Sequence, residues 1–270
     1  MRRSRALCIC LFFTIFCARL SALDPHQPLR QFHHTSWTSK DGLSGSVMAL
    51  AQTPDGYLWV GTSDGLFRFD GLTFDRYKLD SGTFTEGGVS ALFATSDDGL
   101  WIGYEFGGVS LLKNGRLTNY APAPGVSIAE GLPNNTVKGF ALTPDGTIWV
   151  ATVGGLARLE SGRWRGVGLD WEHRPNQVQR PFVDRQGNLW VADISGVKFL
   201  APGLIQFQPA ETDGSFVRSI SQAGDGTIWC AGDGKFVQAI RTRPLGPPAC
   251  SRHAGGKRPW SVRRPTGHLA

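Results

Sequence analysis

An all-β protein made of repeated four-stranded sheets is the fold class that this sequence predicts, and two observations carry the prediction. A phrase with the plan turn, Trp-containing strand, turn and strand occurs five times, most clearly as TPDGTIWVATVGGL at Thr143 to Leu156. Separations of 42, 48, 41 and 39 residues divide its tryptophans, which are Trp59, Trp101, Trp149, Trp190 and Trp229. A strand-rich unit of about 40 residues is typical of a β-propeller blade. We therefore expect a partial or about five-bladed β-propeller.

Each unit is expected to contribute four antiparallel strands. The first strand opens with valine, at residues 47–52, 89–95, 137–142, 178–184 and 217–222. An Asp-Gly turn, or Gln186-Gly187 in the fourth unit, leads to the tryptophan strand, and a glycine-centred turn leads to the third strand. Another glycine turn starts the fourth strand, as in LTFDRYK and RLTNYAP. Turn chemistry and apolar alternation agree throughout this plan.

The five repeat tryptophans are predicted to be packing residues. A single four-stranded sheet would leave both faces apolar, so neighbouring units must bury these faces against one another. Each buried tryptophan removes about 150–250 Å² from water. At about 25 cal/mol per Å², this burial stabilises the fold by roughly 4–6 kcal/mol as an upper bound. The repeated motif is therefore assigned to architecture.

The two ends of the chain differ from the repeats. Residues 1–22 combine a basic start, an apolar run of 13 residues (ALCICLFFTIFCA) and small residues near Ala22. This pattern predicts a secretory signal peptide and an exported protein, with an uncleaved membrane anchor as the alternative. Residues 241–270 hold seven Lys or Arg, no acidic residue and five prolines, without alternation. Such a composition predicts a disordered tail, and an altered or truncated reading frame is a further hypothesis.

Charge and cysteine usage restrict the function. The whole chain carries a net charge of +6, but the ends hold 11 of its 28 basic residues, so residues 23–240 keep 17 basic against 22 acidic residues. A nucleic-acid surface is not expected there, because phosphate binding needs a concentrated basic patch. Cys230 follows a repeat tryptophan and is predicted to be a small buried residue, while a disulfide with Cys250 is left open. No metal-ligand spacing or cofactor motif is present.

Recognition residues are sought where the units differ, because propellers bind through loops at one face of the ring. The connection GLDWEHRPNQ, residues 168–177, combines an aromatic ring with acidic and basic groups. The candidate ligand-binding residues are Tyr104, Glu105, Asp170, Trp171, Glu172, His173, Arg174 and Asp193. They suit a small polar ligand such as a saccharide, which would stack on the ring and hydrogen-bond to the charged groups. Solvated loops without a ligand are the alternative.

No catalytic constellation is recognised, so an enzyme is not expected. His33 and His34 are adjacent on a presumed strand and would point to opposite faces. The Asp-Gly pairs lack the clustered carboxylates of a calcium site. His173 beside Glu172 is the sole source for a propeller lyase of the streptogramin-inactivating type, which is kept as an alternative.

The unit DGYLWVGTSDGLFRFD at Asp55 to Asp70, with FHHTSWTSKDGLSGSV ahead of it, resembles the two-component regulator propeller repeat over roughly residues 29–240. The resemblance implies periplasmic or extracellular propellers, usually of seven blades, that act as ligand-sensing regions of membrane-spanning sensors such as hybrid histidine kinases. The expected function is therefore a non-enzymatic sensor region without its output domain, tied to a membrane only through a missing C-terminal span. An exported protein-interaction scaffold is the alternative.

The resemblance also bears on how the units are arranged. Residues 23–40 form a lead-in segment before the repeats at 41–240, and residues 29–37 are expected to be the outer strand of a blade. Pairing of that strand with the fifth unit would close a small ring. An open arc would leave an exposed blade edge prone to self-association. We favour the arc, because the blade angle of the family suits seven units.

Overall fold

The computed structural model describes residues 34–79, 84, 85, 87–121, 131–174, 176–210, 217–232 and 237–240. Two compact units divide the chain, Met1–Leu43 and Ser44–Ala270. The predicted signal peptide and tail lie outside the described residues. Within the described part, no helix is both long and apolar enough to cross a membrane.

The first unit contains the short 3₁₀ helix η2, Ser39–Asp41. Its Asp41 Oδ2 accepts a hydrogen bond of 2.6 Å from the backbone N–H of Thr38, which completes a capping box. Residues 29–33 of the predicted outer strand lie outside the described residues, and 34–37 form no strand. That part of the prediction is wrong, since the backbone turns into the capped helix instead of pairing in a sheet.

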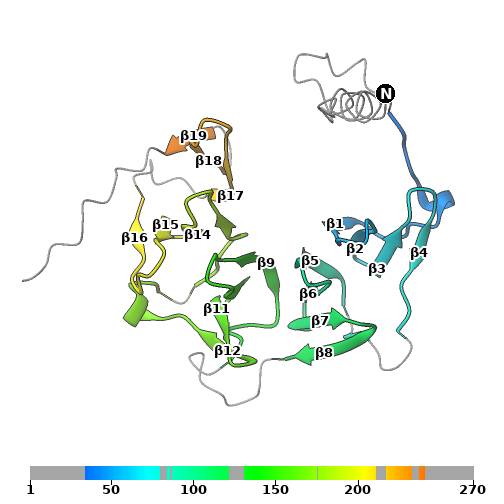
Figure 1. Ribbon diagram of the computed structural model, residues 1–270, viewed down its shortest axis with the longest axis horizontal. Helices are drawn as coiled ribbons and strands as arrows, with labels where there is room; N and C mark the ends of the chain where they lie inside the picture. The colour runs from blue at the N-terminus through cyan, green and yellow to red at the C-terminus, as the bar shows by residue number, and fades with distance from the viewer. Residues whose placement is uncertain are drawn as a thin grey trace, which may run out of the picture. The chain divides into compact units, whose positions relative to one another are not determined.

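Five antiparallel sheets form the described part of the second unit, and they follow one another in chain order (Figure 1). Their strands are β1 Val47–Gln52, β2 Leu58–Thr62, β3 Gly65–Phe69 and β4 Phe74–Arg76; β5 Val89–Ala94, β6 Leu100–Tyr104, β7 Val109–Lys113 and β8 Arg116–Tyr120; β9 Val137–Leu142, β10 Ile148–Thr152, β11 Gly155–Glu160 and β12 Arg163–Gly166; β13 Phe182–Val183, β14 Leu189–Asp193, β15 Gly196–Leu200 and β16 Gln208–Pro209; and β17 Val217–Gln222, β18 Ile228–Gly232 and β19 Val237–Ile240.

The predicted four-strand plan is confirmed for the first four sheets. The first strand of the fourth sheet is much shorter than predicted: β13 covers only Phe182–Val183 of the expected residues 178–184. Pro181 lies directly before it and has no N–H to donate to a ladder. Val178 pairs with Asp193 only as an isolated bridge.

Neighbouring sheets interlock through a valine and a small residue. A Cβ atom at Gly61 of β2 would lie 2.5 Å from Cγ1 of Val89, the first residue of the next sheet. The same atom at Gly103 of β6 would lie 2.4 Å from Cγ1 of Val137. Alanine takes this position in the third and fourth sheets, where Ala151 shares a core with Val178 and Ala192 with Val217. The small residue two places after each tryptophan thus lets the next sheet approach.

A bulge follows the opening valine of four first strands. The pairing register shifts there by one residue in β1, β5, β9 and β17. Bulges re-aim side chains and bend the strand. At Ser90 the re-aimed hydroxyl donates a hydrogen bond of 2.8 Å to the carbonyl oxygen of Val137 in the next sheet. The first strands are therefore linked to one another as well as to their own sheets.

The repeat tryptophans occupy the cores between the sheets, as predicted, in four of five cases. Their exposed fractions are 6% for Trp59, 4% for Trp101, 3% for Trp149, 0% for Trp190 and 38% for Trp229. Three indole N–H groups donate to the residue six positions earlier: Trp59 to Thr53, Trp149 to Thr143 and Trp190 to Asp184, at 2.7–3.0 Å. The fifth sheet has Ala223 in place of that acceptor. Because alanine cannot accept a hydrogen bond through its side chain, the indole N–H of Trp229 lacks the bond made in the other three repeats. Trp229 is also the most exposed of the five tryptophans.

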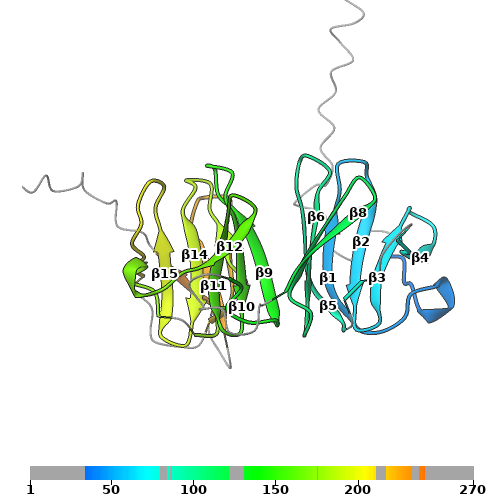
Figure 2. The ribbon, with the colours of Figure 1, turned by 90° about the horizontal axis from the view of Figure 1, so that it is seen from below.

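The extensive contacts between different sheets all join sheets that are consecutive in the chain, such as β1 with β5, β5 with β9 and β14 with β17. Figure 2 shows the strands of neighbouring sheets running in similar directions. Among the described strands, no extensive contact joins the first sheet to the fifth. Cys230 is buried and free, as the sequence suggested, and burial raises the pKa of its thiol to about 11.

Candidate functional site

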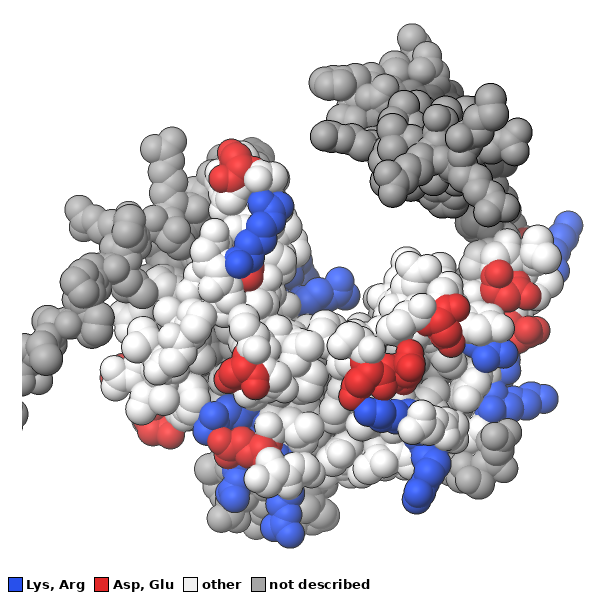
Figure 3. All heavy atoms as spheres, viewed as in Figure 1, with Lys and Arg blue, Asp and Glu red and all other residues white. Residues whose placement is uncertain are grey.

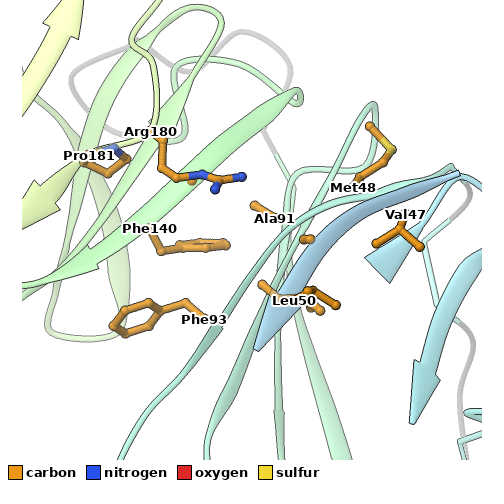
Figure 4. Close-up of a pocket in the computed structure, with 11 residues that line it drawn as sticks. Val47, Met48, Leu50, Ala91, Phe93, Phe140, Arg180 and Pro181 are labelled. Carbon is orange, nitrogen blue, oxygen red and sulfur yellow. The ribbon is translucent and has the colours of Figure 1, made fainter. Parts of the chain in front are cut away.

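The first strands line a pocket of about 410 Å³. Its walls come from β1, β5 and β9 and from the residues just before β13 (Figure 4). The larger apolar residues in the wall are Met48, Leu50, Leu92, Phe93, Phe140 and Pro181. This volume lies within the range of small-molecule sites.

Arg180 is the charged residue of this pocket. Its side chain crosses Gly139, where a Cβ atom would lie 2.9 Å from the arginine Cγ. In Figure 4 the guanidinium extends from the segment before β13 toward the opposite wall, on the same side of the pocket as Phe140. No acidic residue lines the pocket, and within the described part of the chain the guanidinium has no hydrogen-bond or ion-pair partner. A pocket that combines apolar side chains with one cation for which the described residues supply no partner suits a ligand with an apolar body and one anionic group.

The repeat itself contains a signal for Arg180 that the sequence analysis missed. The third residue of the predicted first strand is small in four of the five repeats, at Ala49, Ala91, Gly139 and Ser219. The fourth repeat has Arg180 at this position. Alignment of the five predicted first strands therefore points to this residue, whereas loop composition does not.

The loop residue Trp171 lines a second pocket, of about 250 Å³, together with Trp149 and Arg158. Trp171 ends the 3₁₀ helix η4, Leu169–Trp171, and its ring meets that of Trp149 edge-on, with centroids 5.9 Å apart. The Arg158 guanidinium lies 4.4 Å from the centre of the Trp171 ring and pairs with Glu160. One face of the ring is thus covered by an arginine whose charge is balanced.

The neighbours of Trp171 in the sequence do not join it in this pocket. Asp170, Glu172 and Arg174 are exposed on the loop. The candidate residues of the loop therefore do not form one cluster, because the 3₁₀ turn directs consecutive side chains to different surroundings.

His173 is fully buried and faces Asp193, whose Oδ2 atom lies 3.8 Å from the histidine Nδ1. Neither ring nitrogen of His173 has a hydrogen-bond partner in the described structure. Burial lowers the pKa of His173 to about 4, against the opposing effect of the Asp193 carboxylate. Lys198 Nζ lies 3.7 Å from the same carboxylate oxygen. The histidine is therefore neutral near pH 7 and has no contact with solvent.

The two candidate residues of the second repeat, Tyr104 and Glu105, have different surroundings. Tyr104 ends β6 and is buried, and this burial raises the pKa of its hydroxyl. Glu105 is half-buried, and its carbonyl oxygen accepts a hydrogen bond of 2.5 Å from the Thr136 hydroxyl. The backbone at Glu105 thus links the second repeat to the third.

Charge is mixed on the face shown in Figure 3, where acidic and basic side chains lie close together between wide uncharged areas. In the part of the chain that the structure describes, no three His, Cys, Asp or Glu side chains are grouped as metal ligands. The chemistry available at the first pocket is thus ion pairing by Arg180 and apolar contact.

The successive four-stranded antiparallel sheets define a β-propeller protein. Residues 41–64 and 131–154 match the two-component regulator propeller family, so the chain carries repeats of this type. A stretch of 48 residues is 52% identical to histidine kinase P4 of Formosa agariphila, covering 17% of this chain and 4% of that protein. The match thus spans only a small part of that relative's length.

Two solved structures share the fold. The extracellular domain of a hybrid two-component system of B. thetaiotaomicron is 21% identical, with a TM-score of 0.63 over 73% of this chain and 29% of that one. Virginiamycin B lyase from Staphylococcus aureus is 15% identical, with a TM-score of 0.53 over 68% of this chain and 62% of that one. At these identities the likeness concerns the fold.

Proposed function

We infer that this chain contains a non-enzymatic, exported, ligand-sensing propeller region of a two-component-type signalling protein. The observation that carries the ligand is the Arg180 guanidinium, which has no partner among the described residues, beside the apolar side chains of the first-strand pocket. The propeller repeats and the likeness to an extracellular domain of a two-component system support the signalling role and the location. In whole cells, digestion of the chain by an external protease after outer-membrane permeabilisation would support export.

The ligand that this pocket favours has an apolar body and one carboxylate or similar anion. A guanidinium pairs with a carboxylate through two parallel hydrogen bonds, and the surrounding aromatic and aliphatic walls favour burial of an apolar group. A polar saccharide, expected from the loop at Trp171, remains a separate prediction for the second pocket.

A matched series of probes tests the proposal. Phenylbutyrate, phenylbutanol and phenylbutylamine share one apolar body and differ in charge, and calorimetric titration of the full chain measures their affinities. We expect the carboxylate to bind at least about tenfold more tightly than the alcohol, which corresponds to about 1.4 kcal/mol. The amine should bind most weakly.

Substitution separates the pocket from general surface binding. Arg180→Gln should remove the preference for the carboxylate, whereas Arg163→Gln, a change at an exposed arginine of β12, should leave it unchanged. Equal affinities for the three probes, or a preference that survives Arg180→Gln, would contradict the proposed site.

A lyase is not favoured by any described group. His173, its suggested source, is sealed from solvent and far from ionised near neutral pH. An enzymatic role would predict that His173→Gln abolishes turnover of a streptogramin, while the proposed role predicts no turnover by either protein.

A further inference from the structure

The first and fifth sheets each expose one half of the interface that joins all the other sheets. At every internal junction the opening valine of one sheet packs on the small residue of the preceding sheet. These valines are Val89, Val137, Val178 and Val217, exposed by 2%, 0%, 0% and 5%. Their equivalent in the first sheet, Val47, is 49% exposed.

The fifth sheet shows the complementary half. Ala231 of β18 occupies the position of Gly61, Gly103, Ala151 and Ala192, which receive a valine, and it is only half-buried. Two residues earlier, Trp229 is the most exposed of the repeat tryptophans. The described structure thus leaves one valine without a receiving sheet and one receiving surface without a valine.

We propose that these two faces bind each other between copies of this chain, so that the fifth sheet of one copy packs on the first sheet of the next. The occupant is a second copy because the two exposed faces are the complementary halves of a junction that recurs four times within this chain. The four internal junctions supply the geometry, since each pairs a small residue with a valine. An uncovered face of a repeat is normally polar, whereas the first and fifth sheets present Leu50 and Trp229, exposed by 59% and 38%.

Such an interface is heterologous, since different surfaces of the two copies meet. A heterologous contact leaves each pair with one free face of each kind, so it generates closed rings or open chains of copies. We therefore expect oligomers that grow with protein concentration, instead of a single dimer. This inference does not depend on the proposed ligand.

Two complementary variants test the interface. Val47→Lys places a charge on the first face, and Ala231→Arg does so on the fifth. Each variant alone should be monomeric by light scattering after gel filtration, because each lacks one half of the contact. Their equimolar mixture should give a heterodimer and nothing larger, since one intact pair of faces remains.

Control measurements keep the result decisive. Circular dichroism and thermal melting should show that both variants keep the wild-type fold, and Arg163→Lys should oligomerise like the wild type. A less drastic pair, Val47→Ser and Ala231→Ser, should weaken association in the same pattern if the charged variants fail to fold. A wild-type chain that stays monomeric at all concentrations, or a Val47→Lys variant that self-associates normally, would overturn the proposal.

Discussion

Internal and terminal sheets of this protein contain the same repeat but bury it to different degrees. Trp190, between the fourth and fifth sheets, is fully buried, donates its indole N–H to Asp184 and packs on Phe199 with ring centroids 5.0 Å apart. Trp229, at the same place in the next repeat, is 38% exposed. The comparison shows that burial of a repeat residue depends on the neighbouring sheet as well as on its own sequence.

The largest expected difference is between the two tryptophans themselves. Trp190→Ala should lower the free energy of unfolding by about 3–5 kcal/mol, because it opens a cavity in a closed core and leaves Asp184 without its indole donor. Trp229→Ala should cost less than about 2 kcal/mol, since water already reaches part of its ring. Urea unfolding followed by circular dichroism measures both, and equal losses would refute the comparison.

The buried histidine of an internal junction predicts a pH effect of similar order. The folded-state pKa of His173, about 4, lies below the value of about 6.5 for the unfolded chain. The unfolded state therefore binds the proton first, and stability is full above pH 6.5 and falls as the pH drops toward 4. The total loss is about 3 kcal/mol.

Substitution isolates this effect from the titration of carboxylates. His173→Gln cannot titrate, so its stability should change much less between pH 6.5 and 4.5, although Asp193 and Lys198 remain beside it. Denaturation midpoints across this interval provide the measurement. An identical pH dependence in the variant and the wild type would show that His173 is not the responsible group.

A smaller effect is expected from filling the space at an internal junction. Gly103→Ala places a Cβ atom against Val137 and should cost about 1–3 kcal/mol through overpacking. Combining it with Val137→Ala should recover part of that cost, because the two residues share one contact. At the open face, Ala231→Val in dilute protein should change stability by no more than about 0.5 kcal/mol. No coupling between positions 103 and 137 would argue against the interlock.

The smallest expected effect concerns the missing acceptor of the fifth repeat. Ala223→Thr would restore the residue that binds the indole N–H in the first and third repeats, and should stabilise the fifth sheet by about 1 kcal/mol or less. The matched change Thr143→Val should destabilise the third sheet by a similar amount. Hydrogen exchange of the indole N–H groups reports each bond, and unchanged exchange at Trp229 would show that the threonine does not reach it.

Much of the fold was predictable because the repeat records local rules. Glycine turns and a regularly spaced tryptophan imply hairpins whose sheets must stack, and four complete sheets follow that plan. The predicted strand at 29–37 failed in its described part because its resemblance to a later blade strand says nothing about what it pairs with. The shortened β13 follows from Pro181, a residue whose missing N–H was visible in the sequence.

The candidate site was less predictable. The loop at 168–177 contains the expected chemical groups, yet Trp171 and His173 have separate surroundings, one beside a pocket and one sealed in the interior. Side-chain direction in a 3₁₀ turn depends on backbone geometry that composition does not encode. Arg180 lies two residues before β13, in a segment that the sequence predicts as a first strand, and only comparison of equivalent positions in the five repeats points to it.

The sequence by itself determined the unit of this protein: a four-stranded sheet with a buried tryptophan, a small residue for the next sheet to approach, and a valine to approach it. Tertiary structure alone decided which copies of that unit are covered, placing Val89 in a core and Val47 at a surface. It also decided that Arg180 faces apolar walls from three other sheets. The reason is physical, because burial and pocket formation need atoms from strands far apart in the chain.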